Sequence, residues 1–325
     1  MVNKHSIVAG NINSTSSSSL RLAQKMKDYF QLVKFTLSFT VVFSCVICYL
    51  LAPNVEIHNT DTIIRVIELF IAGMLVTGSA NAINQAVEKD TDAVMKRTGK
   101  RPVASGRMSA DEALTFAGIA GFLGVVIMFR VFNSASALLS AFSLFLYAFI
   151  YTPLKKVNSI AVLVGALPGA LPCLIGWVAA TGLVSPTATF VVRDSVFSNG
   201  AGWVLFGIQF LWQFPHFWAI AWVAHNDYAR AGFKLLPADK GPTRFTAMQA
   251  IMYSVLMVPV GILPYIYHLS GEISLWIVLA CNIGMVIQSI RLYKDMTVKA
   301  ARRVMFSSYI YLPVVLLALL ADKGL

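Results

Sequence analysis

Long apolar stretches recur along this chain and constrain its fold more than any other feature. A membrane-spanning helix needs about 20 mostly apolar residues, and nine segments meet that requirement. To within a few residues they are 33–52, 63–86, 112–131, 135–151, 158–181, 200–224, 246–267, 273–292 and 303–321. Composition agrees, because 57% of residues are hydrophobic and 13% are charged, whereas soluble domains carry about 25% charged residues. The sequence therefore predicts an all-α fold, a polytopic membrane bundle of nine transmembrane helices.

The distribution of Lys and Arg predicts the orientation of this bundle. If the N-terminus is cytoplasmic, 22 of the 26 basic residues fall on the cytoplasmic side. The other four are Arg65, Arg130, Arg193 and Lys323. Lys and Arg are enriched in cytoplasmic loops, so we expect a cytoplasmic N-terminus. The net charge of +11 does not indicate a nucleic-acid partner, because the bases lie between apolar segments; the expected partner is the lipid bilayer.

The N-terminal segment differs from the rest of the chain. It is rich in Ser and Asn and has no apolar run before Val33. We expect a disordered Ser-rich tail over residues 1–30, followed by a single transmembrane domain over residues 31–325. A mitochondrial transit peptide would be richer in Arg, and Arg21 is the only arginine here. We therefore expect a bacterial cell (inner) membrane, with the mitochondrial inner membrane as the alternative.

A charged segment after the second apolar stretch is the first candidate site. If the helix continues, Asn84, Glu88 and Asp92 stand four residues apart and share one face. Three oxygen-bearing side chains on one face can hold a hard divalent cation such as Mg²⁺. The bases just beyond can hold the phosphate that such a cation carries; they are Lys96, Arg97, Lys100, Arg101 and Arg107. The alternative is an ordinary charged cytoplasmic loop, although polar side chains at membrane depth are costly.

The second large cytoplasmic loop follows the sixth apolar stretch. Gln213 and His216 lie inside that stretch, with Gln209, and we expect their shared face to line a cavity. Asp227 could be a second metal-binding acid. Arg230 stands three residues later and could bind phosphate or merely pair with Asp227.

A third patch lies at the cytoplasmic end of the fourth apolar stretch. Tyr151 and Lys155 are four residues apart and point the same way if the helix continues. A phenol and an ammonium there could bind phosphate oxygens. An interfacial Tyr beside a snorkelling Lys is an equally good interpretation.

Together these residues resemble the UbiA superfamily of intramembrane prenyltransferases, from about Lys25 to Leu320. The first family motif, N-x-x-x-D-x-x-x-D, matches Asn84, Glu88 and Asp92, with Glu in place of the usual middle Asp. Asp227 matches the second acidic motif, but Ala231 stands where its later Asp is usual. Three runs resemble the branch of the superfamily that farnesylates heme: MKRTGKRPVASGR, YTPLKKVNSIAVLVGALPGALPCLIGW and WQFPHFW.

The resemblance implies the substrates farnesyl diphosphate and heme B, with Mg²⁺ as the cofactor. It implies four metal ligands: Asn84, Glu88, Asp92 and Asp227. It also implies a set of groups that neutralise the leaving diphosphate: Lys96, Arg97, Arg101, Tyr151, Lys155 and Arg230. A heme vinyl group would attack the allylic cation, and water would complete the product. His216 could contact the heme or hydrogen-bond Gln213. A downstream heme A synthase is a further partner that the resemblance allows.

Two other functions remain open from the sequence. One is a related prenyltransferase that acts on an aromatic quinone precursor. The other is a polyanion transporter gated by its basic loops, although transporters usually place charges or broken helices near the bilayer midplane. Here the charges lie almost wholly at one membrane surface, which favours an enzyme.

Overall fold

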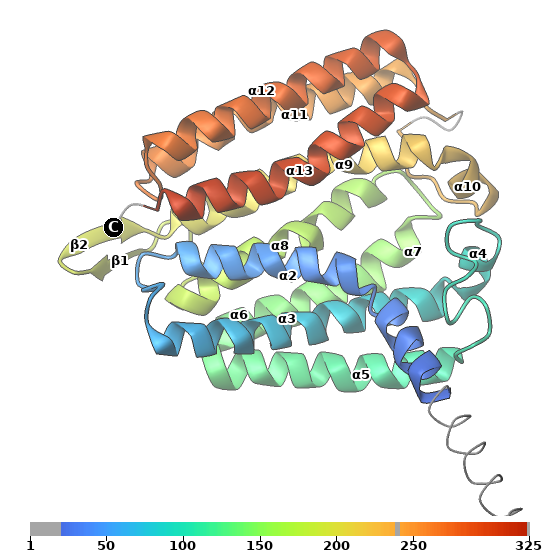
Figure 1. The fold of residues 1–325 in the computed structure, drawn as a ribbon, viewed down its shortest axis with the longest axis horizontal. Coiled ribbons are helices and arrows are strands. Elements are labelled where there is room, and N and C mark those ends of the chain that lie inside the picture. Colours follow the sequence, from blue (N-terminus) through green and yellow to red (C-terminus); the bar gives the residue numbers. More distant parts are fainter. Residues whose placement is uncertain (1–20, 238–240, 324–325) are drawn as a thin grey trace, which may run out of the picture.

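The computed structural model describes residues 21–237 and 241–323, and it is almost entirely helical (Figure 1). A helix over Arg21–Leu32 precedes the labelled elements. The long helices are α2 (Phe35–Leu51), α3 (Thr60–Val87), α5 (Ala110–Ile127), α6 (Ser134–Phe145), α8 (Ala161–Thr181), α9 (Gly200–Val223), α11 (Arg244–Ile266), α12 (Glu272–Asp295) and α13 (Val298–Ala321). The short ones are α4 (Lys89–Ala93), α7 (Thr152–Leu154), α10 (His225–Arg230) and the π-helical turns η1 (Met128–Phe132) and η2 (Leu146–Tyr151).

The predicted number of membrane spans is confirmed. Among the described residues, eight helices are long and apolar enough to cross a membrane. A ninth span combines the helix Arg21–Leu32 with α2, and the two are bent by 50°. The turns η1 and η2 extend α5 and α6 into spans over Ala110–Phe132 and Ser134–Leu154. For eight spans the predicted bounds therefore agree with the structure to within five residues, whereas the first span begins at Arg21, 12 residues before the predicted start at Val33.

Residues 21–30, which we expected to belong to the disordered tail, are helical. Tyr29 and Leu32 pack in a cluster with α5, and Lys25 pairs with Glu112 at 2.6 Å. These contacts order a segment that has no apolar run of its own. The expected disorder of residues 1–20 lies outside the described residues.

A small β-hairpin adds to the predicted all-α fold. Strands β1 (Thr189–Val192) and β2 (Ser195–Ser198) pair antiparallel between α8 and α9. The two turn residues, Arg193 and Asp194, have φ angles of 48° and 64°, as a two-residue type I′ turn requires. Thr, Val and Phe in the strands favour this pairing.

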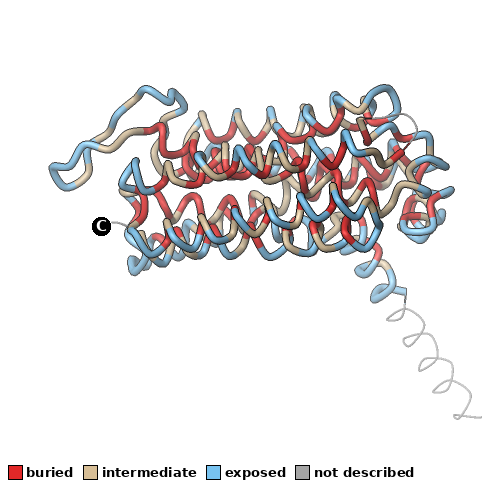
Figure 2. Tube along the Cα trace, turned by 90° about the horizontal axis from the view of Figure 1, so that it is seen from above, coloured by how far each residue is buried: buried red, intermediate tan, exposed pale blue. Residues whose placement is uncertain are grey.

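The long helices pack side by side, with α8 in the middle of the bundle (Figure 1). Helix α2 contacts α3 and α8, and α9 contacts α8, α11 and α13. Gly176 of α8 meets the backbone of α2, where an added Cβ would lie 1.9 Å from the Cys45 carbonyl oxygen. Buried residues run along the centre of the bundle and exposed ones cover its outside (Figure 2). Because many exposed side chains are large and apolar, such as Phe122 and Leu138, the outer surface suits lipid.

The two ends of the bundle carry different features. Helices α4 and α10 lie at one end, whereas the hairpin and the C-terminus lie at the other (Figure 1). The two large loops were predicted to share the cytoplasmic face, and they do lie at the same end. The candidate site is therefore assembled at that end.

Candidate active site

Asn84, Glu88 and Asp92 keep the predicted one-turn spacing although the helix breaks between them. Glu88 leaves the helical conformation (φ −94°, ψ 14°) and separates α3 from α4. The hydrogen bonds nevertheless continue, because Glu88 N donates to Asn84 O at 3.0 Å and Asp92 N donates to Glu88 O at 2.7 Å. All three residues are buried, with exposed fractions of 2%, 5% and 1%. The three polar side chains therefore form one stack inside the protein.

Each residue of this stack contacts a cation from a different segment. Lys34, at the junction before α2, donates to Asn84 Oδ1 at 3.0 Å. Lys155, just after α7, pairs with Glu88 Oε1 at 2.8 Å, and Arg101 pairs with Asp92 Oδ2 at 2.6 Å. We call these six residues the acid–cation cluster. Removing a charge from water is costly unless it is paired. Lys155 and Arg101 are each paired with a carboxylate, whereas Lys34 contacts the neutral amide of Asn84.

Two polar atoms of the acid–cation cluster have no hydrogen-bond partner among the described residues. They are Asp92 Oδ1, an acceptor, and Asn84 Nδ2, a donor, and both are buried. An unsatisfied buried group typically costs about 1–3 kcal/mol. A carboxylate oxygen suits Mg²⁺, which prefers oxygen ligands, and an amide N–H suits an anion. The residues present therefore fit a cation–anion pair such as Mg²⁺ with a diphosphate.

Tyr151 and Lys155 point the same way, as predicted. The Lys155 ammonium lies 4.6 Å from the centre of the Tyr151 ring, a cation–π distance. Behind the ring, a Cβ on Gly165 would lie 2.5 Å from a Tyr151 ring carbon, so glycine is needed there. Because Lys155 is buried and paired with Glu88, it belongs to the site rather than snorkelling to the surface.

The second loop approaches the first, but its acid remains separate from the acid–cation cluster. Arg97 donates to the Tyr228 hydroxyl at 3.2 Å, which joins the first loop to α10. Asp227, on α10, pairs with Arg230. No group of three Asp, Glu, His or Cys residues lies close enough to hold a metal in the part of the chain that is described. Lys96 is exposed. Asp227 thus lies at the same end of the bundle as Glu88 and Asp92, but it does not join them in a cluster of carboxylates.

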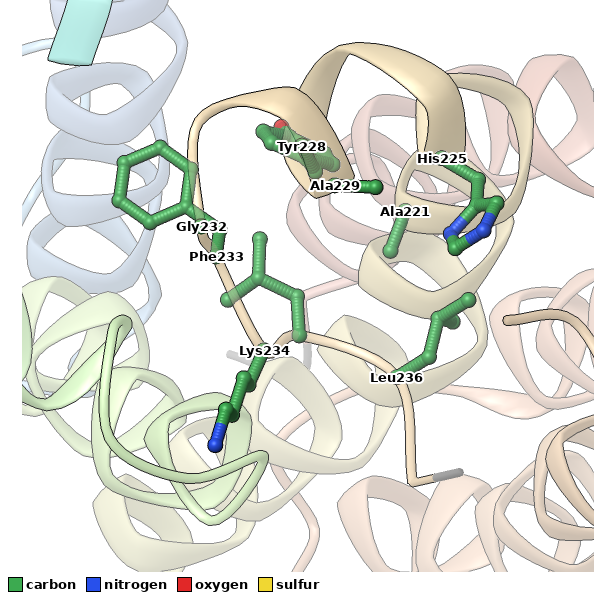
Figure 3. A pocket seen from close by; sticks show the side chains of 9 residues that line it. Ala221, His225, Tyr228, Ala229, Gly232, Phe233, Lys234 and Leu236 are labelled. Atoms are coloured by element: carbon green, nitrogen blue, oxygen red, sulfur yellow. The ribbon is translucent and has the colours of Figure 1, made fainter. Parts of the chain in front are cut away.

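A cavity of about 360 Å³ lies beside α10 (Figure 3). It is lined by Ala221, His225, Tyr228, Ala229, Gly232, Phe233, Lys234, Leu235 and Leu236. The Phe233 ring centre lies 5.8 Å from the Lys155 ammonium, and Lys234 N donates to Lys155 O at 2.8 Å. The loop that lines this cavity therefore contacts the acid–cation cluster.

A second, apolar cavity of about 40 Å³ lies deeper in the bundle between α2, α3, α6 and α8. Its lining includes Val42, Leu69, Val76, Met128 and Ile175. Helix α3 carries part of this lining and, further along, Asn84. At 1.5 Å per residue, Val76 and Asn84 are about 12 Å apart along the axis. Helix α3 thus contributes residues both to the acid–cation cluster and to the apolar cavity.

Gln213 and His216 contact two different neighbours of α9. Gln213 Nε2 donates to the Ala166 carbonyl of α8 at 3.0 Å. His216 Nδ1 instead contacts Ser308 Oγ of α13 at 2.8 Å, and its ring stacks on Trp212. The alternative in which His216 hydrogen-bonds Gln213 is therefore not found, and the heme contact stays a prediction. These side chains join α9 to two different neighbours, which the spacing along α9 could not reveal.

Lys34 is a site residue that the sequence reasoning missed. It stands at the start of the first apolar stretch, where a lysine is typical of the positive-inside pattern. The only indication in the sequence was that Lys34 has apolar neighbours on both sides: Leu32 and Val33 before it and Phe35 after it. Its position beside Asn84 depends on a bend in the backbone, and a bend of this kind is visible only in the structure.

Comparisons with known proteins show the family and the fold of this chain. Residues 41–311 match the model of the UbiA prenyltransferase family. The protoheme IX farnesyltransferase of Cytophaga hutchinsonii is 42% identical over 93% of this chain and 99% of its own length. A digeranylgeranylglyceryl phosphate synthase structure superposes with a TM-score of 0.72 at 22% identity, covering 92% of this chain and 98% of that chain.

A structure of a UbiA homologue from Archaeoglobus fulgidus, bound to GPP and Mg²⁺, has the same fold. Its TM-score is 0.59 at 14% identity, over 90% of this chain and 99% of that chain. The family match covers most of the chain, including the whole Asn84–Asp92 stack and α10. This protein belongs to the UbiA prenyltransferase family.

Proposed function

We propose that this protein transfers the farnesyl group of farnesyl diphosphate to a vinyl group of protoheme IX (heme B). The products are heme O, which carries a hydroxyethylfarnesyl group, and diphosphate. The observation that carries the proposal is the acid–cation cluster, with its unpaired acceptor on Asp92 and unpaired donor on Asn84. The choice of heme as the acceptor is supported by the Cytophaga hutchinsonii relative, which is named a protoheme IX farnesyltransferase.

Asn84, Glu88 and Asp92 would hold Mg²⁺, with Asp227 reaching the same ion from α10. The Archaeoglobus fulgidus homologue bound to GPP and Mg²⁺ supports this choice of ion. When bound, Mg²⁺ would neutralise charge on the diphosphate and so make it a better leaving group. For Asp227 to join, its pair with Arg230 must open, and both side chains are exposed enough to move.

The cations of the site would stabilise the charge that develops as the allylic C–O bond breaks. Arg101 and Lys155 are already held at the cluster. Lys96, Arg97 and Arg230 come from the more exposed loops and would close on the diphosphate. Tyr151 would position the Lys155 ammonium through its ring. The electron pair of the broken bond leaves with the diphosphate.

The remaining steps need an apolar enclosure. The heme vinyl group donates its π electrons to C1 of the farnesyl cation, which forms the new C–C bond. Water then adds to the resulting carbocation and loses a proton, which gives the hydroxyl group. We propose that the apolar helix faces around Val42 and Val76 enclose the farnesyl chain and keep stray water from the cation. The cavity of about 40 Å³ there is far smaller than a typical ligand pocket, so these helices must move apart to receive the chain.

His216 is our proposed contact for the heme acceptor. The ring is half-buried between Ser308 and Trp212, so one edge can face a flat macrocycle. Gln213 would shape the same region by holding α9 against α8. A His216→Ala variant should lower turnover with heme and leave farnesyl diphosphate binding intact. Unchanged steady-state rates would contradict the heme contact.

We propose the bacterial inner membrane as the location. The support is the family's membrane fold, the excess of Lys and Arg on one side, and the bacterial source of the Cytophaga hutchinsonii relative. The mitochondrial inner membrane remains the alternative. An enzyme that oxidises the heme O product, a heme A synthase, is the proposed partner downstream.

An assay of the purified protein in lipid nanodiscs tests the proposal. Heme B, farnesyl diphosphate and Mg²⁺ should give a heme whose mass has risen by one farnesyl group and one hydroxyl group. A chelator that removes Mg²⁺ should abolish the reaction. Transport of a polyanion, by contrast, would not depend on Mg²⁺. A parallel reaction with an aromatic quinone precursor is the decisive control. A prenylated phenol without any heme O would overturn the heme assignment.

A further inference from the structure

We propose that the helix Arg21–Leu32 is a positioning arm for the diphosphate site. An ion pair between the buried Asp28 and the exposed Arg107 docks this helix on the first cytoplasmic loop, and the docking holds Lys34 at Asn84. Lys34 would contact the diphosphate itself, whereas Asp28 and Arg107 are positioning residues that act through it. The inference rests on the proposed function, because it assigns a diphosphate to this site.

The docking contact is an ion pair that the fold buries on one side. Arg107 Nε donates to Asp28 Oδ1 at 2.9 Å, and Asp28 is only 3% exposed. The same guanidinium donates to Gln31 Oε1 at 2.9 Å and to the Lys100 carbonyl at 3.0 Å. Exposed ion pairs contribute little, but a pair with a buried partner resists separation. This contact therefore fixes the helix to the loop that also carries Arg101.

The chain then bends at a junction that α3 stabilises. Gln85 Nε2 donates to the carbonyls of Gln31 and Leu32 at 2.8 and 2.9 Å. Asn81 Nδ2 donates to the Val33 carbonyl at 3.2 Å. The bend leaves the carbonyls of Leu32 and Val33 without a helical N–H, and each receives a side-chain donor instead. The Gln31 carbonyl accepts from the Lys34 backbone N at 3.2 Å as well as from Gln85. Because α3 also carries Asn84, the junction is built against the helix that bears the site.

Lys34 occupies the critical position in this junction. Its backbone is left-handed, with φ 48° and ψ 58°, a conformation that non-glycine residues rarely adopt. Strain of this kind persists where the surroundings hold it, and it clusters at functional sites. Here it directs the ammonium to Asn84 Oδ1 at 3.0 Å. The strained backbone is thus explained by the placement of one charge at the site.

Membrane anchoring alone does not account for this arrangement. Leu22, Met26 and Phe30 recur every four residues and are exposed, and the Phe30 ring contacts Phe35 of α2. This apolar row suits the membrane interface and explains why the helix stays there. It does not explain a buried Asp28 or three capped carbonyls on the opposite side. Those features fix the position at which the helix ends, and therefore the position of Lys34.

Binding measurements without heme test the inference. We would measure the dissociation constant of farnesyl diphosphate with Mg²⁺, and the inhibition constant of inorganic pyrophosphate. Lys34→Met should weaken both by about tenfold, because one hydrogen bond to a charged group is lost. Asp28→Asn should weaken both in the same direction by about threefold. Lys27→Ala, at an exposed neighbouring position on the same helix, is the matched control and should leave both unchanged.

The double variant separates positioning from simple stability. If Asp28 acts through Lys34, the Asp28→Asn, Lys34→Met protein should bind no more weakly than Lys34→Met alone. Arg107→Lys, which keeps a cation opposite Asp28, should retain most of the affinity. Additive losses, or an Asp28→Asn protein that melts earlier but binds normally, would overturn the inference. Because no acceptor is needed, failure of heme farnesylation in the wild type would sink only the proposed function.

Discussion

The two acidic regions at the cytoplasmic end are built in opposite ways. Asn84, Glu88 and Asp92 are almost fully buried, and their cations Lys34, Lys155 and Arg101 come from three separate segments. Asp227 is partly exposed and pairs with Arg230 in the same short helix. The first region is assembled by the whole fold, whereas local helical spacing alone explains the second.

This difference suggests a division of labour between a fixed half and a movable half of the site. Buried charge pairs are costly to break, by about 3–5 kcal/mol when one partner is removed. Exposed pairs are worth about 0–1 kcal/mol, so Asp227 and Arg230 can separate at little cost. We therefore expect the first region to define the reaction geometry and the second to close on the bound diphosphate.

The largest expected effect is that of Asp92→Asn on the catalytic rate. Asn keeps one acceptor oxygen, so the variant loses the negative charge and can retain either the unpaired acceptor or the partner of Arg101, but not both. We expect kcat for farnesyl transfer to fall by about 10³-fold, as for loss of a strong transition-state contact. Asp90→Asn, at an exposed site two residues away, should stay within about twofold. A similar loss in both variants would remove the distinction between buried and exposed acids.

Glu88→Gln should have the largest effect on stability. It leaves the Lys155 ammonium buried without its counter-charge, so we expect the free energy of unfolding in mixed micelles to fall by about 3 kcal/mol. Adding Lys155→Met removes the stranded charge and should recover part of this loss, without recovering activity. If Glu88→Gln unfolds like the wild type, the first region is not preassembled as we describe.

Asp227→Asn should act mainly on metal dependence. Because Asp227 would reach the ion from the movable side, we expect the Mg²⁺ concentration for half-maximal activity to rise by about tenfold. The rate at saturating Mg²⁺ should fall far less than in Asp92→Asn. A titration of activity against Mg²⁺ measures both quantities. An unchanged titration curve would exclude Asp227 from the ligand set.

The smallest expected effect is that of Arg230→Met on folding. The side chains of Arg230 and Asp227 are 49% and 20% exposed, so the free energy of unfolding should change by about 1 kcal/mol, less than for a buried pair. The KM for farnesyl diphosphate should still rise by a few fold, because one phosphate contact is lost. A stability loss as large as that of Glu88→Gln would show that the two regions are built alike.

The sequence predicted the features that depend on residues close together in the chain, namely the membrane spans and the spacing of residues along one helix. Each apolar stretch became a helix close to the expected bounds, because a bilayer leaves α-helices as the natural solution for such segments. The stack of Asn84, Glu88 and Asp92 also follows from one helical period, and it survives the break at Glu88. The placement of Lys and Arg predicted which loops would meet at one end.

The tertiary structure alone decided which groups meet across the bundle. Glu88 and Lys155 are separated by 67 positions, and Asn84 and Lys34 by 50, so no spacing rule links them. Gln213 and His216 share a face of α9 by spacing, yet packing turned one toward α8 and the other toward α13. Local periodicity determines how one helix presents its residues. The partners that receive them depend on how helices distant in sequence pack, and this is a property of the folded chain.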